Sequence, residues 1–209
     1  MPVLVIGNGE SRSDLDLSLY VKNFTTVGCN AIHRDITVDH LVCCDQRMVR
    51  EAARNLNNNS SKIYTRQRWL NTNLRSVGDL NPLPNIPIFG NSKPDDDFHW
   101  GSGPYAVLLG CHLSTEIVLV GFDLYSNNDF VNNVYKGTDN YSKSESSSVD
   151  PAFWIYQIEK LFDHFKDHNF ICLNKESWVP PKSWQKENVR FRNHKFLDRM
   201  VDIINTDVV

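Results

Sequence analysis

The chain has 209 residues, of which 41% are hydrophobic, and a formal net charge of -3. This size and composition suit one folded domain, and the near-neutral charge argues against bulk nucleic-acid binding. Asparagine is unusually frequent, with 22 copies. Because asparagine is mainly a turn residue, the excess indicates many loops, polar recognition by amides, or a composition habit of the source genome.

The first half of the chain alternates short apolar runs with polar turns. The runs predict strands, with a short helical stretch within Asp14–Tyr20 and an amphipathic helix over Gln46–Asn55. The stretch from about Arg66 to Trp100 is rich in Asn and Pro, and within it only one run looks strand-like. The predicted strands are Val3–Ile6, Phe24–Cys29, His40–Cys44, Lys62–Thr65 and Ile86–Phe89.

The second half is more regular. Gly103–His112 predicts a buried helix with Pro104 in its first turn. The strand Ile117–Gly121 follows, and then a polar loop over 127–148 that is long enough to be functional or disordered. Asp150 and Pro151 are suited to the N-cap and N1 positions of another helix, and Phe170–Leu173 predicts the last strand.

The predicted strands are continuously apolar and alternate with helices. This pattern is typical of a parallel sheet covered on both faces. The expected fold is therefore α/β and Rossmann-like, a mostly parallel sheet with helices on both faces in a single domain. We expect this domain over 1–177, with an insert at about 57–98 and a mobile loop at about 126–149, and a basic amphipathic tail over 178–209.

Polar or small residues follow four of the predicted strands, and a Gly-Ser-Gly turn starts the helix near residue 103. In this kind of fold ligands bind outside the carboxyl ends of the strands, and free N–H groups at a helix start hold phosphates. Each segment alone also fits a turn or a helix cap, but together they favour a nucleotide site. The segments are Gly7-Asn8-Gly9-Glu10-Ser11, Cys29-Asn30, Cys44-Asp45, Gly121-Phe122-Asp123 and Gly101-Ser102-Gly103.

Two common nucleotide-binding fingerprints are missing from the sequence. It has neither Gly-x-Gly-x-x-Gly nor the Walker pattern Gly-x-x-x-x-Gly-Lys-Ser/Thr. Hydride transfer and P-loop ATP hydrolysis are therefore disfavoured. The five cysteines form no Cys-x-x-Cys pair, and no apolar run approaches the ~20 residues of a membrane span. A reduced, cytoplasmic protein is the expected context.

The strand-end segments resemble the bacterial sialyltransferases of glycosyltransferase family 42 and the related superfamily of motility-associated glycosyltransferases and 6-hydroxymethylpterin diphosphokinase-like proteins. Val5–Ser11 resembles the family's Gly-Asn-Gly-Pro-Ser-Leu motif, and Cys29-Asn30 resembles its second-strand Cys-Asn. Gly101–Tyr105 is similar to its Thr-Ser-Gly-Val-Tyr helix start, and Val118–Tyr125 to its Leu-x-Gly-Ile-Asp-Phe-Tyr strand end. The resemblance covers most of 1–177, with a gap between about 57 and 98.

The resemblance implies a Rossmann-like transferase that moves a sugar from a nucleotide-activated donor such as a CMP-sugar to a glycan or glycolipid acceptor. No divalent metal is essential in that family, although the acidic Asp45, in place of an amide, leaves Mg²⁺ open here. Tyr125 would lie near the leaving phosphate. The implied donor-binding residues are Gly7, Asn8, Gly9, Ser11, Asn30, Asp45, Ser102, Gly103 and Asp123.

One departure from the family concerns the general base, which is a histidine in the loop before the last helix. The chain has no histidine between 113 and 163, and Glu145 falls at the matching position. A glutamate can act as a base if its pKa is raised, but a solvated loop carboxylate is the simpler interpretation. His99, directly before the Gly-Ser-Gly turn, is a further candidate to face the pocket.

Two other functions and the tail stay open at this point. A pterin diphosphokinase-like transferase using ATP would use Asp45 and Asp123 for Mg²⁺, and a non-catalytic nucleotide-binding or structural protein would explain the absent histidine. In the tail, Lys182–Arg199 is basic, and Phe196, Leu197, Met200, Ile203 and Ile204 share one helical face. Such a helix can lie on the inner membrane face, dock on its own domain, or join a second subunit.

Overall fold

The computed structural model describes residues 1–55, 60–70, 80–88, 95–126 and 129–206. They form one open sheet of eight parallel strands in the order β5-β4-β3-β2-β1-β6-β7-β8. The strands are β1 (Val3–Ile6), β2 (Thr25–Cys29), β3 (His40–Val42), β4 (Lys62–Thr65), β5 (Leu80–Pro82), β6 (Glu116–Val120), β7 (Asn169–Leu173) and β8 (Val189–Arg192). The α/β, Rossmann-like prediction is confirmed.

The central strands are apolar because both of their faces are covered. In β1 the side chains of Val3 and Val5 belong to one core cluster, and those of Leu4 and Ile6 to the other. Successive strand residues point to opposite faces, so a strand buried on both sides needs an apolar residue at every position. This is the pattern that allowed the strands to be predicted.

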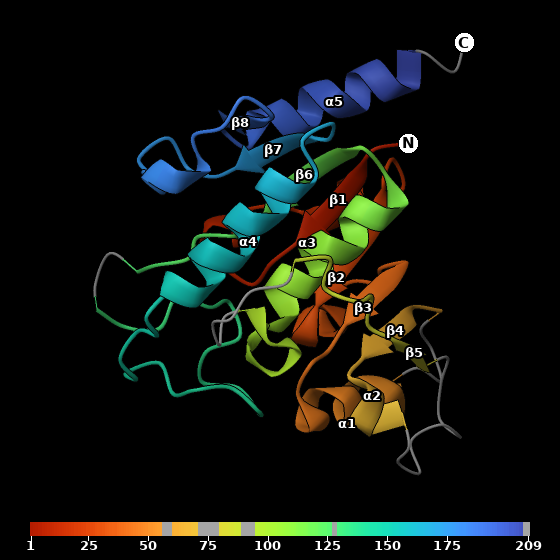
Figure 1. The fold of residues 1–209 in the computed structure, drawn as a ribbon, viewed down its shortest axis with the longest axis vertical. Coiled ribbons are helices and arrows are strands. Elements are labelled where there is room, and N and C mark those ends of the chain that lie inside the picture. Colours follow the sequence, from red (N-terminus) through yellow and green to blue (C-terminus); the bar gives the residue numbers. More distant parts are fainter. Residues whose placement is uncertain (56–59, 71–79, 89–94, 127–128, 207–209) are drawn as a thin grey trace.

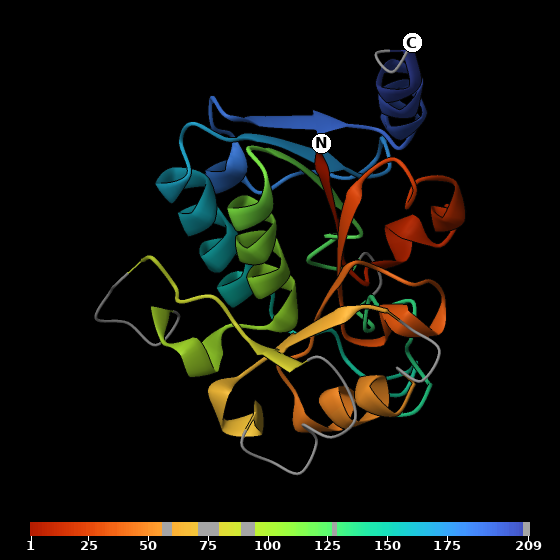
Figure 2. The ribbon, with the colours of Figure 1, turned by 90° about the vertical axis from the view of Figure 1, so that its right-hand side faces the viewer.

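Helices cover the two faces separately, as Figures 1 and 2 show. α3 (Ser102–Leu113) and α4 (Ala152–His164) pack on one face, whereas α1 (Gln46–Asn55) and α5 (Lys195–Thr206) pack on the other. The short α2 (Gln67–Leu70) follows β4. The described residues also contain 3-10 helices of three to five residues: η1 (Glu10–Arg12), η2 (Leu17–Leu19), η3 (Asn30–Arg34), η7 (Asp97–His99) and η8 (Lys182–Trp184).

The order of the strands reverses between β1 and β6. β1 pairs with β2 on one side and with β6 on the other, and the chain leaves these two strands in opposite directions across the sheet. Crevices at the carboxyl ends of such a switch point are the usual ligand sites of open α/β sheets. The fold therefore places the ends of β1 and β6 at the expected location of a site.

The prediction for region 57–98 was wrong in its strand. The fifth strand is Leu80–Pro82, and Ile86–Ile88 is not a strand; Phe89 lies outside the described residues, as do 57–59. Ile86 is buried in a core cluster, so its apolar run reflects burial rather than pairing. Pro87 interrupts this run and Pro84 lies two residues before it, and neither proline has the backbone donor that a ladder needs.

The segment 178–209, expected as a basic tail, contributes to the same sheet and core. Its β8 extends the sheet beside β7, and Trp184 is fully buried. No strand was predicted there, because its arginines favoured a basic tail, although Val189–Arg192 has the alternation of apolar and charged residues that is typical of a half-buried edge strand. In α5, Leu197 and Ile204 pack on the domain, whereas Ile203, at the edge of the same helical face, is exposed.

Two local predictions also need correction. Within Asp14–Tyr20 only the 3-10 turn η2 forms. At α4 the N-cap position is taken by Pro151, while the Asp150 carboxylate accepts a hydrogen bond from the Ala152 backbone N–H at 2.9 Å. Asp150 thus caps the helix from one residue further out. Within the described residues, no helix has the length and apolar character that crossing a bilayer requires.

Candidate nucleotide site

A cavity of about 450 Å³ opens at the carboxyl ends of β1, β2, β3 and β6. Residues from four separate strand ends and from the start of α3 line it together, as the sequence predicted. Of the nine predicted donor-binding residues, eight line this cavity: Gly7, Asn8, Gly9, Asn30, Asp45, Ser102, Gly103 and Asp123. The topology thus brings together, in one site, motifs that lie more than 100 residues apart in the sequence.

Asn8 is the buried amide that follows β1. Its Nδ2 donates to the Cys29 carbonyl at 3.4 Å and to the Tyr141 hydroxyl at 3.2 Å. Its Oδ1 is buried and has no hydrogen-bond partner. An unpaired buried acceptor is costly, so Asn8 presents an oxygen that a donor group of a ligand would satisfy.

Asn30 occupies the corresponding position after β2. Its backbone is left-handed, with φ of 53°, a conformation that asparagine tolerates better than most residues. Its Oδ1 is also buried without a partner. Leu124, after β6, has φ of 69°, and strained residues of this kind concentrate at functional sites. Two strand ends therefore hold unfavourable backbone conformations at one cavity.

Ser11 lies just outside the cavity lining and fixes the carboxylate of Asp123. The Ser11 backbone N–H donates to Asp123 Oδ2 at 2.8 Å, and the Ser11 hydroxyl donates to Asp123 Oδ1. Asn174 Nδ2 donates to the same Oδ1 at 3.3 Å. Asp123 is 5% exposed, and three protein donors already occupy its oxygens, which is the arrangement a buried carboxylate needs.

Gly7 and Gly9 are required by close protein contacts. A Cβ on Gly7 would lie 2.4 Å from the Gly121 carbonyl oxygen, and one on Gly9 would lie 2.4 Å from Asp123 Cγ. Gly121 itself has φ of +72°, which only glycine adopts without strain. The glycines thus let the ends of β1 and β6 meet; their predicted role, an approach of the backbone to a phosphate, stays a prediction.

The start of α3 supplies the backbone donors of the site. Ser102 and Gly103 form its first turn, where N–H groups have no partner within the helix. The Ser102 hydroxyl accepts from the Cys44 N–H at 3.0 Å, which ties the helix start to the end of β3. Such a terminus with a positive dipole end is suited to a phosphate.

Two thiols line the cavity without being reactive. Burial raises the pKa of Cys29 to about 12, although the nearby Arg12 lowers it in part. Burial likewise raises the pKa of Cys44 to about 11, against the lowering effect of Arg66 and of the Ser102 hydrogen bond. The thiolate is the nucleophilic form, so both side chains act as small apolar groups at neutral pH.

The two residues predicted to be catalytic do not line this cavity. Glu145 is exposed in the loop that follows β6. The Tyr125 ring stacks on Trp178, with 6.4 Å between ring centroids, and burial raises the pKa of its phenol. His99, in contrast, lines the cavity, and its Nδ1 is buried without a partner.

The sequence did not indicate three residues that organise the site from the loop and from η1. Arg12 is buried; its Nε donates to the Gly7 carbonyl and its Nη2 to the Tyr135 hydroxyl. The Tyr135 hydroxyl donates to Asp35, and the Tyr141 hydroxyl meets Asn8. Burial raises the pKa of both phenols, which keeps them neutral and able to donate. The sequence feature that could have indicated Tyr135 and Tyr141 is the occurrence of aromatic residues in an otherwise polar loop.

The charge of the lining is negative. Among the described lining residues, Arg66 is the one arginine, against the carboxylates of Asp45, Asp123 and Asp150, for a formal charge of -2. Arg66 also donates to the Trp100 carbonyl at 2.6 Å and so positions η7 beside the cavity. Among the residues that the structure describes, no three His, Cys, Asp or Glu residues gather in a way that could hold a metal ion.

The sequence matches no family model and no curated protein. Among solved structures, the chain is similar to the sialyltransferase CstII from Campylobacter jejuni in complex with a substrate analogue, cytidine-5'-monophosphate. That match has a TM-score of 0.53 and 16% identity, and it covers 91% of this chain and 84% of that chain. A sialyltransferase CST-II structure in complex with a trisaccharide acceptor and CMP gives 0.49 at 17% identity, covering 82% and 80% of the two chains. At this identity the likeness concerns the fold: the chain has the architecture of the Campylobacter sialyltransferase.

Proposed function

We propose that the protein is a glycosyltransferase that takes a sugar from a nucleoside-monophosphate donor, such as a CMP-sugar, and transfers it to a glycan acceptor. The observation that carries this proposal is the joint lining of one switch-point cavity by eight predicted residues, including two buried amide oxygens that have no partner. A cavity that bound only apolar groups would not need these buried amide oxygens as hydrogen-bond acceptors. The fold shared with CstII is consistent with this use of the cavity.

The polar groups of the cavity divide into two sets with different partners. The Oδ1 atoms of Asn8 and Asn30 accept hydrogen bonds, which ribose hydroxyls or an exocyclic amino group of a base would donate. The N–H groups at the start of α3 donate, and a phosphate oxygen would accept them. The two sets together fit a nucleotide with its phosphate at the α3 terminus.

The negative lining favours a donor with one phosphate over one with two. A nucleoside diphosphate brings an additional negative charge into a lining that already carries three carboxylates and one arginine. Like charges near one another disfavour binding. At its phosphate groups a CMP-sugar carries one negative charge where a UDP-sugar carries two, so the CMP part is the better match to the charge of the cavity.

In the proposed reaction, the acceptor hydroxyl oxygen forms a bond to the anomeric carbon of the donor sugar. The bond from that carbon to the phosphate oxygen breaks, and the nucleoside monophosphate leaves with the electron pair. A base takes the acceptor proton. We propose testing Glu145 and His99 for this role, because the first matches the sequence position of the family's base and the second lines the cavity.

A ligand screen by thermal shift tests the proposal directly. CMP at 100 times its dissociation constant should stabilise the fold by about 2.7 kcal/mol, more than UDP or ATP at the same concentration. Asn8→Ala should weaken CMP binding by about 10-fold to 100-fold, since each lost hydrogen bond costs about 1–3 kcal/mol. The matched control is Asn205→Ala, an exposed residue of α5 that should leave CMP binding unchanged.

Turnover separates an enzyme from a binding protein. Hydrolysis or transfer of the sugar from CMP-sialic acid by the wild type, reduced at least tenfold in Asn8→Ala, is the expected result. Failure of both CMP-sugars and UDP-sugars to bind or to react would contradict the proposal. Loss of turnover in His99→Gln but not in Glu145→Gln would assign the base to His99, and the reverse result would assign it to Glu145.

A further inference from the structure

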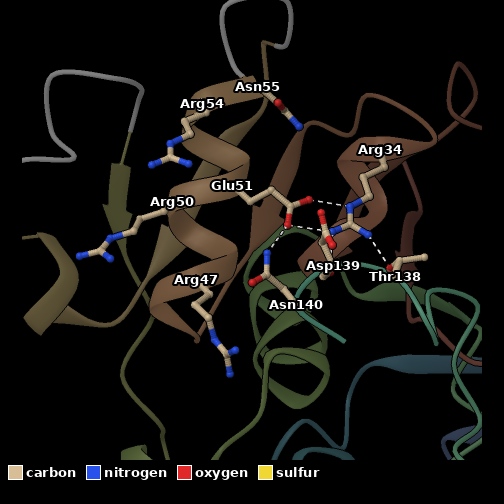
Figure 3. A pocket seen from close by; sticks show the side chains of 9 residues that line it. All are labelled: Arg34, Arg47, Arg50, Glu51, Arg54, Asn55, Thr138, Asp139 and Asn140. Carbon is tan, nitrogen blue, oxygen red and sulfur yellow. Dashed lines mark hydrogen bonds and ion pairs between the residues drawn. The ribbon is translucent and has the colours of Figure 1, made fainter. Parts of the chain in front are cut away.

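A second cavity, of about 590 Å³, lies between α1, η3 and the loop after β6, outside the candidate nucleotide site. Figure 3 shows that arginines dominate it. Arg47, Arg50 and Arg54 come from α1 and Arg34 from η3, whereas Glu51 and Asp139 are its carboxylates. Its formal charge is therefore +2 in a chain whose net charge is -3.

One arginine of this pocket is held in place by the protein. Arg34 donates through Nε and Nη2 to the two Glu51 carboxylate oxygens at 2.5 and 2.8 Å. It also donates to the Thr138 hydroxyl at 2.8 Å and to the Asp139 carbonyl at 2.9 Å. The Asn140 amide donates to Glu51 at 2.7 Å. Glu51 is thus fully engaged and is not available to neutralise the other arginines.

The three arginines of α1 have no such partner. Arg47, Arg50 and Arg54 are exposed, and within the described part of the chain they make no ion pair and no hydrogen bond. Like charges three or four residues apart on a helix destabilise it slightly. Three cations on one side of a helix therefore do not stabilise the fold, which points to an external anion.

The shape of the pocket indicates what kind of anion it suits. Arg54 lies seven positions after Arg47, which is about 10 Å along a helix that rises 1.5 Å per residue. One phosphate group is too small to contact both ends. Guanidinium forks pair with phosphate oxygens in a bidentate manner. The other described lining residues are polar (Asn55, Thr138 and Asn140), and none of them has an aromatic ring on which a base would stack.

We propose that this arginine pocket binds a ligand that carries two or more phosphate groups. Such a ligand is either a free polyphosphate or a phosphorylated group of the acceptor. The loop connects the two cavities: Asn140 lines the arginine pocket, and the next residue, Tyr141, contacts Asn8 of the nucleotide site. A phosphorylated acceptor bound here would lie beside the donor, but binding itself does not depend on the proposed transferase function.

Calorimetric titration with inorganic tripolyphosphate tests the proposal, with orthophosphate as the comparison at equal ionic strength. We expect tripolyphosphate to bind at least tenfold more tightly than orthophosphate. The double variant R47Q/R50Q should lose at least tenfold in affinity, because glutamine keeps the helix propensity but not the charge. R190Q/R199Q removes the same charge from exposed positions on β8 and α5, far along the sheet, and should bind as the wild type does.

Equal affinities for tripolyphosphate and orthophosphate, or equal losses in the two double variants, would overturn the proposal. A phosphorylated oligosaccharide, tested before and after phosphatase treatment, identifies the source. Phosphatase-sensitive binding that tripolyphosphate displaces assigns the pocket to the acceptor, and binding of tripolyphosphate alone assigns it to a free polyphosphate. Asn8→Ala should retain tripolyphosphate binding, so failure of the proposed function and failure of this inference are distinguishable.

Discussion

Two cavities of this molecule, the candidate nucleotide site and the arginine pocket, differ in charge and in construction. The candidate nucleotide site carries a formal charge of -2 over its described lining residues and is built from strand ends, glycines, amides and a helix start. The arginine pocket carries +2 and is built from long side chains on the surface of α1 and η3. Both are suited to phosphate, one through backbone and amide dipoles and the other through full charges.

This difference has a physical consequence for how each site depends on the fold. Fixed dipoles recognise a ligand only if their positions are accurate, so the nucleotide site depends on the close approach of β1 and β6. Exposed arginines reach a ligand through flexible side chains, and their attraction is screened by salt. Substitutions at the first site should therefore change stability and binding together, and those at the second should change binding alone.

The largest expected effect is that of Gly7→Ala. The added Cβ would lie 2.4 Å from the Gly121 carbonyl, which is backbone and cannot turn aside. We expect a loss of about 3 kcal/mol in the free energy of unfolding, as is typical of an overpacked core, measured by urea denaturation. Gly103→Ala is the control: its Cβ would meet Phe122 at an ordinary 3.5 Å. Equal stability of the two variants would contradict the proposed contact of β1 with β6.

Ser11→Ala should have the next largest effect. It removes the hydroxyl that donates to the buried Asp123 carboxylate, and a buried acceptor that loses a donor costs about 1–3 kcal/mol. Ser13→Ala, two residues away, removes an exposed hydroxyl that contacts only the Glu10 carbonyl. It should change the free energy of unfolding by less than about 0.5 kcal/mol. A Ser11→Ala protein as stable as Ser13→Ala would show that Asn174 and the Ser11 backbone suffice for Asp123.

Glu51 gives a smaller effect that depends on pH. Partial burial alone would raise its pKa, but hydrogen bonds from Arg34 and Asn140 outweigh burial and hold the pKa below its ordinary value. A carboxylate with a lowered folded-state pKa stabilises the protein above its unfolded-state pKa, and this contribution is lost as the pH falls through the folded-state value. Glu51→Gln should therefore show a shallower loss of stability on acidification, by at most about 1 kcal/mol. If the free energy of unfolding fell with pH in the same way for the wild type and for Glu51→Gln, this would contradict the stabilising ion pair of Glu51 with Arg34.

The smallest expected effect on stability is that of R47Q/R50Q. Both side chains are exposed and have no partner in the described residues, so the free energy of unfolding should change by less than about 0.5 kcal/mol. CMP binding should also stay unchanged, since neither arginine lines the nucleotide cavity. A large destabilisation would mean that these arginines serve the fold, and the contrast between the two cavities would not hold.

Prediction from the sequence succeeded for the elements whose signal is local. Val3–Ile6, Lys62–Thr65 and Gln46–Asn55 form with the predicted bounds, because a strand buried on both faces and an amphipathic helix leave a direct pattern of apolar residues. Prediction failed where a buried apolar run does not pair as a strand, and where a strand pairs in the sheet with some of its side chains exposed. Ile86 is buried without being in a strand, and β8 pairs at an edge with arginines facing outward.

The sequence by itself determined the α/β, mostly parallel fold and eight of the residues that line the crevice, because polar motifs that follow parallel strands converge at one edge of the sheet. Only the tertiary structure decided what those residues contact. In the structure the glycines allow β1 and β6 to approach each other, and Ser11 and Asn174 donate hydrogen bonds to Asp123. Glu145 and Tyr125 lie outside the cavity lining. Tyr141 contacts Asn8, which is 133 residues away in the sequence. These contacts depend on side chains meeting across the sheet, and no periodicity along the chain records them.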